Sequence, residues 1–151
     1  MTQLADQTPR TVVVTGGNRG IGFAIAERLL ADGHRVAVTA RSGSGPEGTL
    51  TVSADMSDAA SIDAAFTQIE AEYGPIEVVV ANAGITKDTL LLRMSEEEFT
   101  SVIDTNLTGT FRVVKRAAKG LLKQRFGRVI LISAAAVSPR MSSPQASSRP
   151  T

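Results

Sequence analysis

The stretch VVVTGGNRGIG, residues 12–22, has the residue types and spacing that bind a diphosphate. A β-branched run ends at Thr15, and Gly16, Gly20 and Gly22 punctuate the turn that opens the next predicted helix. Because these positions carry no Cβ, the backbone can approach a pyrophosphate, and free N–H groups at the helix N-terminus meet its negative charge. The place of the glycines, after a strand and before a helix, favours this interpretation over a tight turn selected only for packing. The predicted contacts in this turn are Gly16, Asn18, Arg19, Gly20, Ile21 and Gly22.

The end of the second predicted strand, VAVTAR, indicates which dinucleotide the glycine turn would hold. A site for NAD usually places an acidic residue about 20 positions beyond the turn, where it bonds the ribose 2′-hydroxyl. Ala40 and Arg41 occupy that region here, and a guanidinium suits a 2′-phosphate because the two pair through charge-assisted bonds. Arg19, inside the glycine turn, can reach the same phosphate. We therefore predict NADP(H) as the cofactor; the alternative is that both arginines are solvated surface residues.

The pattern Thr-Gly-x-x-x-Gly-x-Gly that starts at Thr15 resembles the short-chain dehydrogenase/reductase family. Further matches are Asn-Ala-Gly at residues 82–84 after the fourth predicted strand, Asp55 after the third, and Asn106 within TNLTGTF. Within the family, TGGNRGIG, DTNLTGTFRVVKRA and FGRVILIS are most similar to bacterial 3-oxoacyl-acyl-carrier-protein reductases, particularly those of actinobacteria. The resemblance implies that Asp55 lies at the adenine ring, and it adds these cofactor contacts: Asp55, Met56, Asn82, Ala83 and Gly84.

The same resemblance implies an oxidoreductase that reduces 3-oxoacyl (β-ketoacyl) thioesters on acyl carrier protein in fatty-acid synthesis, with full-length relatives that are homo-oligomers. In the family, a tyrosine supplies the proton, and a lysine four residues on lowers its pKa. That lysine is required, because an unperturbed tyrosine pKa of about 10 makes proton transfer poor at neutral pH. The one tyrosine of this sequence is Tyr73, which Glu77 follows four residues on, and the last lysine is Lys123. The sequence therefore contains no Tyr-x-x-x-Lys, and we interpret Tyr73 as a packing residue at a helix end.

Two other family positions give candidate catalytic residues. Asn106 occupies the place of the asparagine that supports a proton-relay water. Ser133 precedes Ala134, whereas family members usually read Ser-Ser or Gly-Ser there and use the second residue to orient the substrate carbonyl. Ser133 would serve only if the loop shifted, and it otherwise ends the strand. We therefore predict that this chain is catalytically incomplete on its own; the alternative function is a non-catalytic NADPH-binding or interaction module.

Short β-branched runs alternate with helical patterns along the chain, and these elements must position the candidate residues. The β-branched runs predict strands buried on both faces, as in a parallel sheet covered by helices, at residues 11–15, 35–39, 49–53, 76–80 and 128–132. Apolar residues at helical spacing predict helices at 21–31, 57–73 and from about 95 to 122. Ser95 and Glu98 form a capping box at the start of the last helix. The alternation predicts an α/β fold, a doubly wound parallel sheet of Rossmann type with only the first five strands of the family.

Composition excludes several functional classes. A length of 151 residues suits one domain, and a net charge of +1 implies neither nucleic acid nor membrane as a partner. The absence of cysteine excludes disulfides and thiolate metal sites, and we predict no metal site. No apolar stretch suits a signal peptide or a membrane span, so we expect a cytoplasmic protein.

We expect three segments along the chain. They are an N-terminal arm (1–10), an incomplete NADP-binding Rossmann-type domain (11–137) and a disordered tail (138–151) rich in serine, proline and arginine. The abrupt change of composition near Val137 leads to the hypothesis of a truncated or frameshifted coding sequence, with a natural polar tail as the alternative. The strand at 128–132 would then form an apolar sheet edge with unpaired backbone groups, which predicts aggregation or dependence on a partner.

Overall fold

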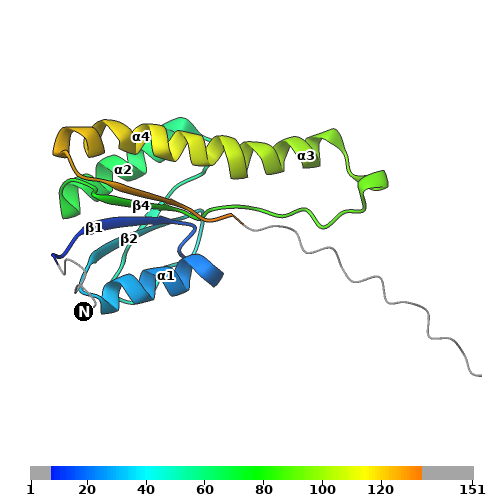
Figure 1. Ribbon diagram of the computed structural model, residues 1–151. Helices are drawn as coiled ribbons and strands as arrows, with labels where there is room; N and C mark the ends of the chain where they lie inside the picture. The colour runs from blue at the N-terminus through cyan, green and yellow to red at the C-terminus, as the bar shows by residue number, and fades with distance from the viewer. Residues whose placement is uncertain (1–7, 134–151) are drawn as a thin grey trace, which may run out of the picture.

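The computed structural model describes residues 8–133; the predicted tail, residues 134–137 of the predicted domain and residues 1–7 of the predicted arm lie outside the described residues. Within the described part, one parallel sheet has the strand order β3-β2-β1-β4-β5 (Figure 1). Its strands are β1 (Thr11–Thr15), β2 (Arg35–Ala40), β3 (Leu50–Ser53), β4 (Val78–Ala81) and β5 (Arg128–Leu131). The predicted doubly wound sheet of Rossmann type is confirmed.

Helices cover both faces of the sheet. Helix α1 (Gly20–Ala31) lies on one face, and α2 (Ala59–Tyr73) and α4 (Gly109–Gln124) lie on the other (Figure 1). Because successive side chains of a strand point to opposite faces, alternate valines of β1 enter separate apolar clusters: Val12 and Val14 pack on the side of α1, and Val13 on the side of α2 and α4. None of the helices in residues 8–133 is long and apolar enough to cross a membrane.

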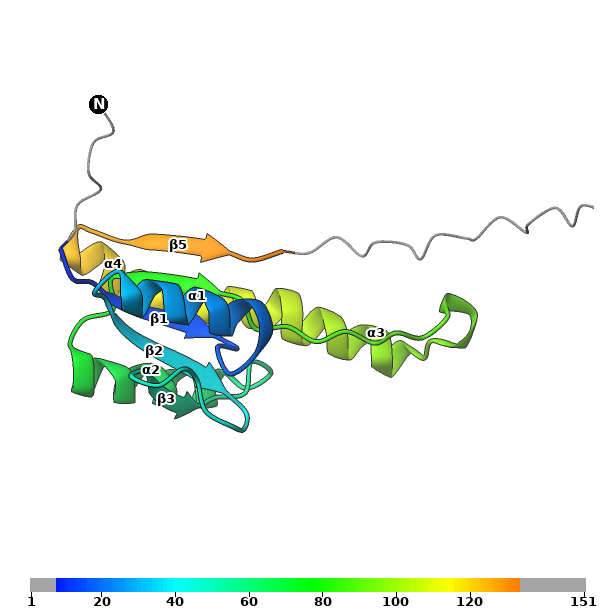
Figure 2. The same cartoon turned by 90° about the horizontal axis from the view of Figure 1, so that it is seen from below.

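The long helix predicted from about 95 to 122 is confirmed as helical throughout, and it contains a π-helical turn that the sequence pattern did not predict. After the short 3₁₀ turn η1 (Leu91–Arg93), the chain forms α3 (Glu96–Ile103), then the π-helical turn η2 (Asp104–Thr108), then α4. The capping box is confirmed, since the Ser95 hydroxyl accepts from the Glu98 N–H at 3.1 Å. Helix α3 extends beyond the sheet (Figure 2), where the sheet does not cover it.

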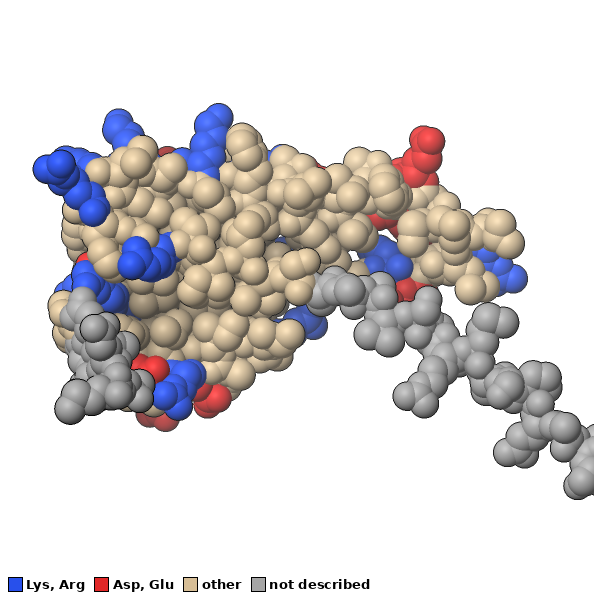
Figure 3. Space-filling model, viewed as in Figure 1, with Lys and Arg blue, Asp and Glu red and all other residues tan. Residues whose placement is uncertain are grey.

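Strand β5 lies along one edge of the sheet and pairs with β4 (Figure 2). Its side chains are exposed, with exposed fractions of 39% for Val129, 47% for Ile130 and 58% for Leu131. Among residues 8–133, β5 pairs with β4 alone, so the prediction of an apolar edge strand is confirmed. The prediction of burial on both faces is wrong for β5, since all four of its residues are exposed. The surface along this edge shows few charged side chains (Figure 3). The predicted aggregation of this edge stays a prediction.

Candidate functional site

A cavity of about 480 Å³ opens at the carboxyl ends of β1, β2 and β4. β2 and β3 lie on one side of β1, and β4 and β5 lie on the other, so this is the point where the strand order reverses. Open α/β sheets bind their ligands at such a switch point, and the volume lies within the range of small-molecule sites. Every predicted cofactor contact except Gly22 lines the cavity: Gly16, Asn18, Arg19, Gly20, Ile21, Arg41, Asp55, Met56, Asn82, Ala83 and Gly84.

The cavity has further lining residues that the sequence interpretation missed. They are Thr39, Ala40, Ser42, Ala54, Ile85 and Thr105. Most of them lie next to predicted contacts in the sequence, at the ends of β2, β3 and β4. Extending the prediction by one or two residues at each strand end would have found them. Thr105 comes from the π-helical turn, which the sequence pattern did not reveal.

The glycine turn presents bare backbone to the cavity. Gly16 and Gly20 have φ angles of 66° and 57°, in the left-handed region that favours glycine. An added Cβ at Gly20 would meet no atom within 4 Å, so this position faces open space. No side chain caps the first turn of α1, and that turn carries no acidic residue. Its N–H groups are therefore available to an anion.

Gly22 lies beneath the turn and serves packing. A Cβ at this position would lie 2.4 Å from Asn82 Nδ2 and 2.5 Å from the carbonyl oxygen of Gly16. Asn82 Nδ2 donates to the carbonyl oxygens of Thr15 at 3.1 Å and Gly16 at 3.2 Å, so this side chain ties the end of β4 to the glycine turn. Gly22 thus makes room for the side chain that fixes the turn.

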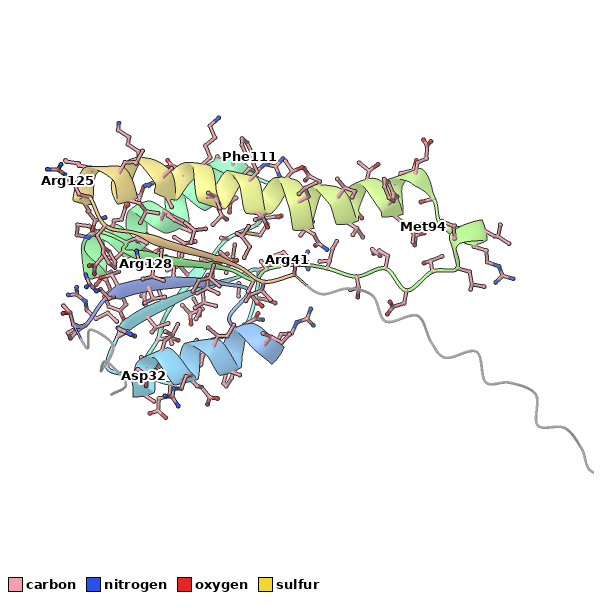
Figure 4. All side chains as sticks on the ribbon, in the orientation of Figure 1. Asp32, Arg41, Met94, Phe111, Arg125 and Arg128 are labelled. Atoms are coloured by element: carbon pink, nitrogen blue, oxygen red, sulfur yellow. The ribbon has the colours of Figure 1, made fainter. Side chains whose placement is uncertain are left out.

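Two exposed guanidinium groups lie at the rim of the cavity, from Arg19 and Arg41. In the described part of the chain neither of them forms a salt bridge. Arg41 projects at the end of the sheet where α1 begins (Figure 4). Asn18 Nδ2 donates to the Ser42 carbonyl oxygen at 3.0 Å, which joins the glycine turn to the loop after β2. This bond therefore links the turn that carries Arg19 to the loop that carries Arg41.

Asp55 supplies an ionised carboxylate to the wall of the cavity after β3. Its Oδ1 atom accepts from the Ser57 hydroxyl at 2.7 Å and from the Ser57 N–H at 2.8 Å. These hydrogen bonds, with the charges of Arg41 and Arg112, lower the pKa of Asp55 below its ordinary value. Both bonds engage the same oxygen, so Oδ2 remains an acceptor for a ligand.

The two catalytic candidates, Asn106 and Ser133, lie outside the lining of the cavity. Asn106 lies in the π-helical turn, where Oδ1 accepts from the Ile85 N–H at 2.7 Å and Nδ2 donates to the Ile85 carbonyl at 2.9 Å. Ser133 is exposed just beyond β5, and neither residue lines the cavity. Tyr73 ends α2, and its carbonyl accepts from the hydroxyl of Thr11, the first residue of β1. It therefore lies at the opposite end of the sheet from the cavity. Within residues 8–133 there is no cluster of three or more side chains that could hold a metal ion.

Comparisons with known proteins agree with this geometry. A family model described as "short chain dehydrogenase" matches residues 10–147. The 3-oxoacyl-[acyl-carrier-protein] reductase MabA of Mycobacterium avium is 57% identical over 123 residues, which cover 82% of this chain and 48% of that protein. The corresponding reductase FabG of Escherichia coli is 40% identical over 131 residues, 82% of this chain and 54% of its own length. The chain thus spans about half the length of the curated relatives it matches.

Proposed function

The chain belongs to the short-chain dehydrogenase family, and we propose that it binds NADP(H) in the switch-point cavity as part of a reductase of 3-oxoacyl groups on acyl carrier protein. The observation that carries this proposal is the joint placement of an uncapped helix N-terminus, a bare glycine turn and two arginines without salt bridges in the described residues. A dinucleotide diphosphate and a further phosphate are the chemistry that such a set of donors recognises.

Each part of the cavity fits one part of NADP(H). The open backbone at Gly20 and the N-terminus of α1 suit the diphosphate. Arg19 and Arg41 suit the ribose 2′-phosphate, since guanidinium groups pair with phosphate through two parallel hydrogen bonds. Asp55 Oδ2 suits a donor on the adenine ring. The absence of an acidic residue directly after β2 supports NADP(H) over NAD(H).

The proposed chemistry of this chain is binding without turnover. Bound NADPH would supply hydride to a carbonyl carbon, and the reaction also needs a proton donor at the carbonyl oxygen. Tyr73 lies at the far end of the sheet, with Glu77 in place of a lysine four residues on. Both polar atoms of the Asn106 amide are engaged by Ile85, so this side chain braces the loop after β4. The 151 residues therefore contain the cofactor-binding part of a reductase site.

The names of the relatives supply the substrate class and the partner of this proposal. The names of MabA and FabG describe reductases of 3-oxoacyl groups on acyl carrier protein. We propose the same substrate class for this protein. A cytoplasmic location and homo-oligomeric assembly are further parts of the proposal. A non-catalytic NADPH-binding or interaction module remains the second candidate, and it is favoured by a cavity whose described lining residues include no tyrosine.

One experiment tests both the proposed cofactor binding and the proposed absence of turnover. The purified chain is titrated with NADPH by cofactor fluorescence and then given a β-ketoacyl thioester while NADPH absorbance is followed. The proposal predicts saturable binding and no oxidation of NADPH above the rate without protein. Turnover by the 151 residues would contradict the proposed incompleteness, and an absence of NADPH binding would contradict the proposed function.

A further inference from the structure

Arg112, in the first half of α4, joins two parts of the structure that border the cavity. Its Nη1 atom donates to the Met56 carbonyl oxygen at 3.0 Å, and its Nη2 atom lies 2.9 Å from Asp104 Oδ1. The side chain is 22% exposed and that of Asp104 34%, so the ion pair is partly shielded from solvent. A planar guanidinium with two directed bonds holds both partners in a defined geometry.

The two partners of Arg112 have different places in the site. Met56 lines the cavity directly after Asp55, on the side proposed for the adenosine. Asp104 is the first residue of the π-helical turn, which continues with Thr105, another lining residue, and then Asn106. Short π-helical segments occur frequently at functional sites. Arg112 therefore spans from the cavity wall to the turn that carries the Asn106 side chain.

A second contact brings the same two parts together. A Cβ added at Gly109 would lie 2.9 Å from the Met56 Cβ and 3.0 Å from the Met56 carbonyl oxygen. Gly109 follows the π-helical turn directly, so only a residue without a side chain lets the start of α4 lie against the loop after β3. The backbone of Gly109 therefore lies close against the Cβ and carbonyl oxygen of Met56, and in such close packing a displacement of Met56 is transmitted to the turn.

We propose that Arg112 is a positioning residue that couples the adenosine side of the cavity to the π-helical turn, so that cofactor binding and the Asn106–Ile85 contact stabilise each other. This inference rests on the proposed function for the identity of the cofactor. Coupling between two sites is reciprocal, so a cofactor that restrains Met56 also restrains the turn, and loosening the turn weakens cofactor binding. The charge of Arg112 also acts on Asp55, the neighbour of Met56.

Arg116 offers a matched control on the same helix. One turn beyond Arg112, it pairs with Glu70 of α2 at 2.8 Å and also with Asp63 of α2. These partners belong to α2, and neither lines the cavity. Arg112→Met removes the bonds to the Met56 carbonyl and the Asp104 carboxylate, and Arg116→Met removes the bonds to Asp63, Thr67 and Glu70. The two variants therefore separate loss of helix packing from loss of coupling.

The experiment measures NADPH affinity by fluorescence titration and amide hydrogen exchange with and without NADPH. We expect Arg112→Met to raise the NADPH dissociation constant about tenfold and Arg116→Met to leave it within about twofold, since allosteric couplings are typically of that order. In the wild type and in Arg116→Met, NADPH slows exchange of the Ile85 amide relative to the amides of β1. In Arg112→Met this slowing is lost, and Arg112→Lys, which keeps a cationic donor, restores part of it.

The outcomes distinguish the inference from the proposed function. If the wild type binds NADPH and Arg112→Met binds it equally well with the same slowing at Ile85, the coupling role is wrong. If the wild type binds no nicotinamide cofactor, the proposed function fails. Amide hydrogen exchange measured without cofactor then still tests the inference. Of the two variants, only Arg112→Met should speed exchange of the Ile85 amide relative to the amides of β1. Should Arg112→Met not fold, Asp104→Asn weakens one arm of the same bridge and is scored by the same readouts.

Discussion

Replacing Gly22 by alanine tests whether the glycine turn is built around close packing. The added Cβ would lie 2.4 Å from Asn82 Nδ2 and 2.5 Å from the Gly16 carbonyl oxygen, well inside van der Waals contact. Asn82 can move only by giving up its bonds to Thr15 and Gly16, and the Gly16 carbonyl is part of the backbone of the turn. The substitution therefore has to displace the turn that is proposed to hold the diphosphate.

The size of the effect follows from opposing contributions. Overpacking a tight contact costs about 1–3 kcal/mol. Two lost hydrogen bonds of Asn82 cost roughly 0.5–1.5 kcal/mol each. Alanine gains about 1 kcal/mol over glycine inside a helix such as α1. We expect Gly22→Ala to lower the free energy of unfolding by about 1–5 kcal/mol and to weaken NADPH binding.

Gly120 in α4 supplies the control, because a Cβ there would meet only Glu70 Oε1, at an ordinary 3.9 Å. We expect Gly120→Ala to raise stability by up to about 1 kcal/mol and to leave NADPH affinity unchanged. Urea denaturation gives the free energies of unfolding, and fluorescence titration gives the affinities. The packing argument is refuted if Gly22→Ala is as stable as Gly120→Ala, or if it binds NADPH like the wild type.

Two further predictions concern charged groups. Arg41→Ala should weaken NADPH roughly tenfold or more while leaving NADH within about twofold, because the charge-assisted bond to the 2′-phosphate is lost; equal losses for both cofactors in parallel titrations would contradict this. Burial tends to raise the pKa of Glu77, but hydrogen bonds from Arg10 and the Thr11 N–H lower it overall. A carboxylate whose pKa is lowered on folding contributes stability above its unfolded pKa of about 4.3, and this contribution is lost as the pH falls through the folded pKa. Glu77→Gln should therefore be less stable than wild type at neutral pH, by roughly 1–2 kcal/mol, with the difference shrinking in acid; a difference that grows below pH ~4 would show that the sign is wrong.

The strands and the cofactor cavity were predictable because they depend on local patterns. Runs of β-branched residues identified the strands, and the lengths of the intervening helices required parallel connections. The carboxyl ends of such strands meet at one edge, so residues that follow different strands, such as Gly16, Arg41 and Asp55, line one cavity. Boundaries were less exact: β4 begins at Val78 and not Ile76, whose carbonyl accepts from Gln124 on α4.

The features that could not be predicted depend on contacts between distant segments. Nothing in the apolar spacing marks the π-helical turn, because Asn106 binds the backbone of Ile85 and Gly109 packs on Met56. The same holds for Arg112 and Arg116, because their helical spacing gives no indication of a partner. Both arginines instead form ion pairs with acidic side chains. Helical periodicity predicts which face a residue occupies, and it does not predict its partner.

The most direct test of the account is a pair of titrations of the purified 151-residue chain, one with NADPH and one with NADH. The account predicts that NADPH binds roughly tenfold more tightly or better, because the two cofactors differ only by the phosphate that Arg19 and Arg41 are placed to bind. Equal affinities, or tighter binding of NADH, would contradict the assignment of the two arginines. A failure to bind either cofactor would contradict the central claim that this cavity holds a nicotinamide dinucleotide.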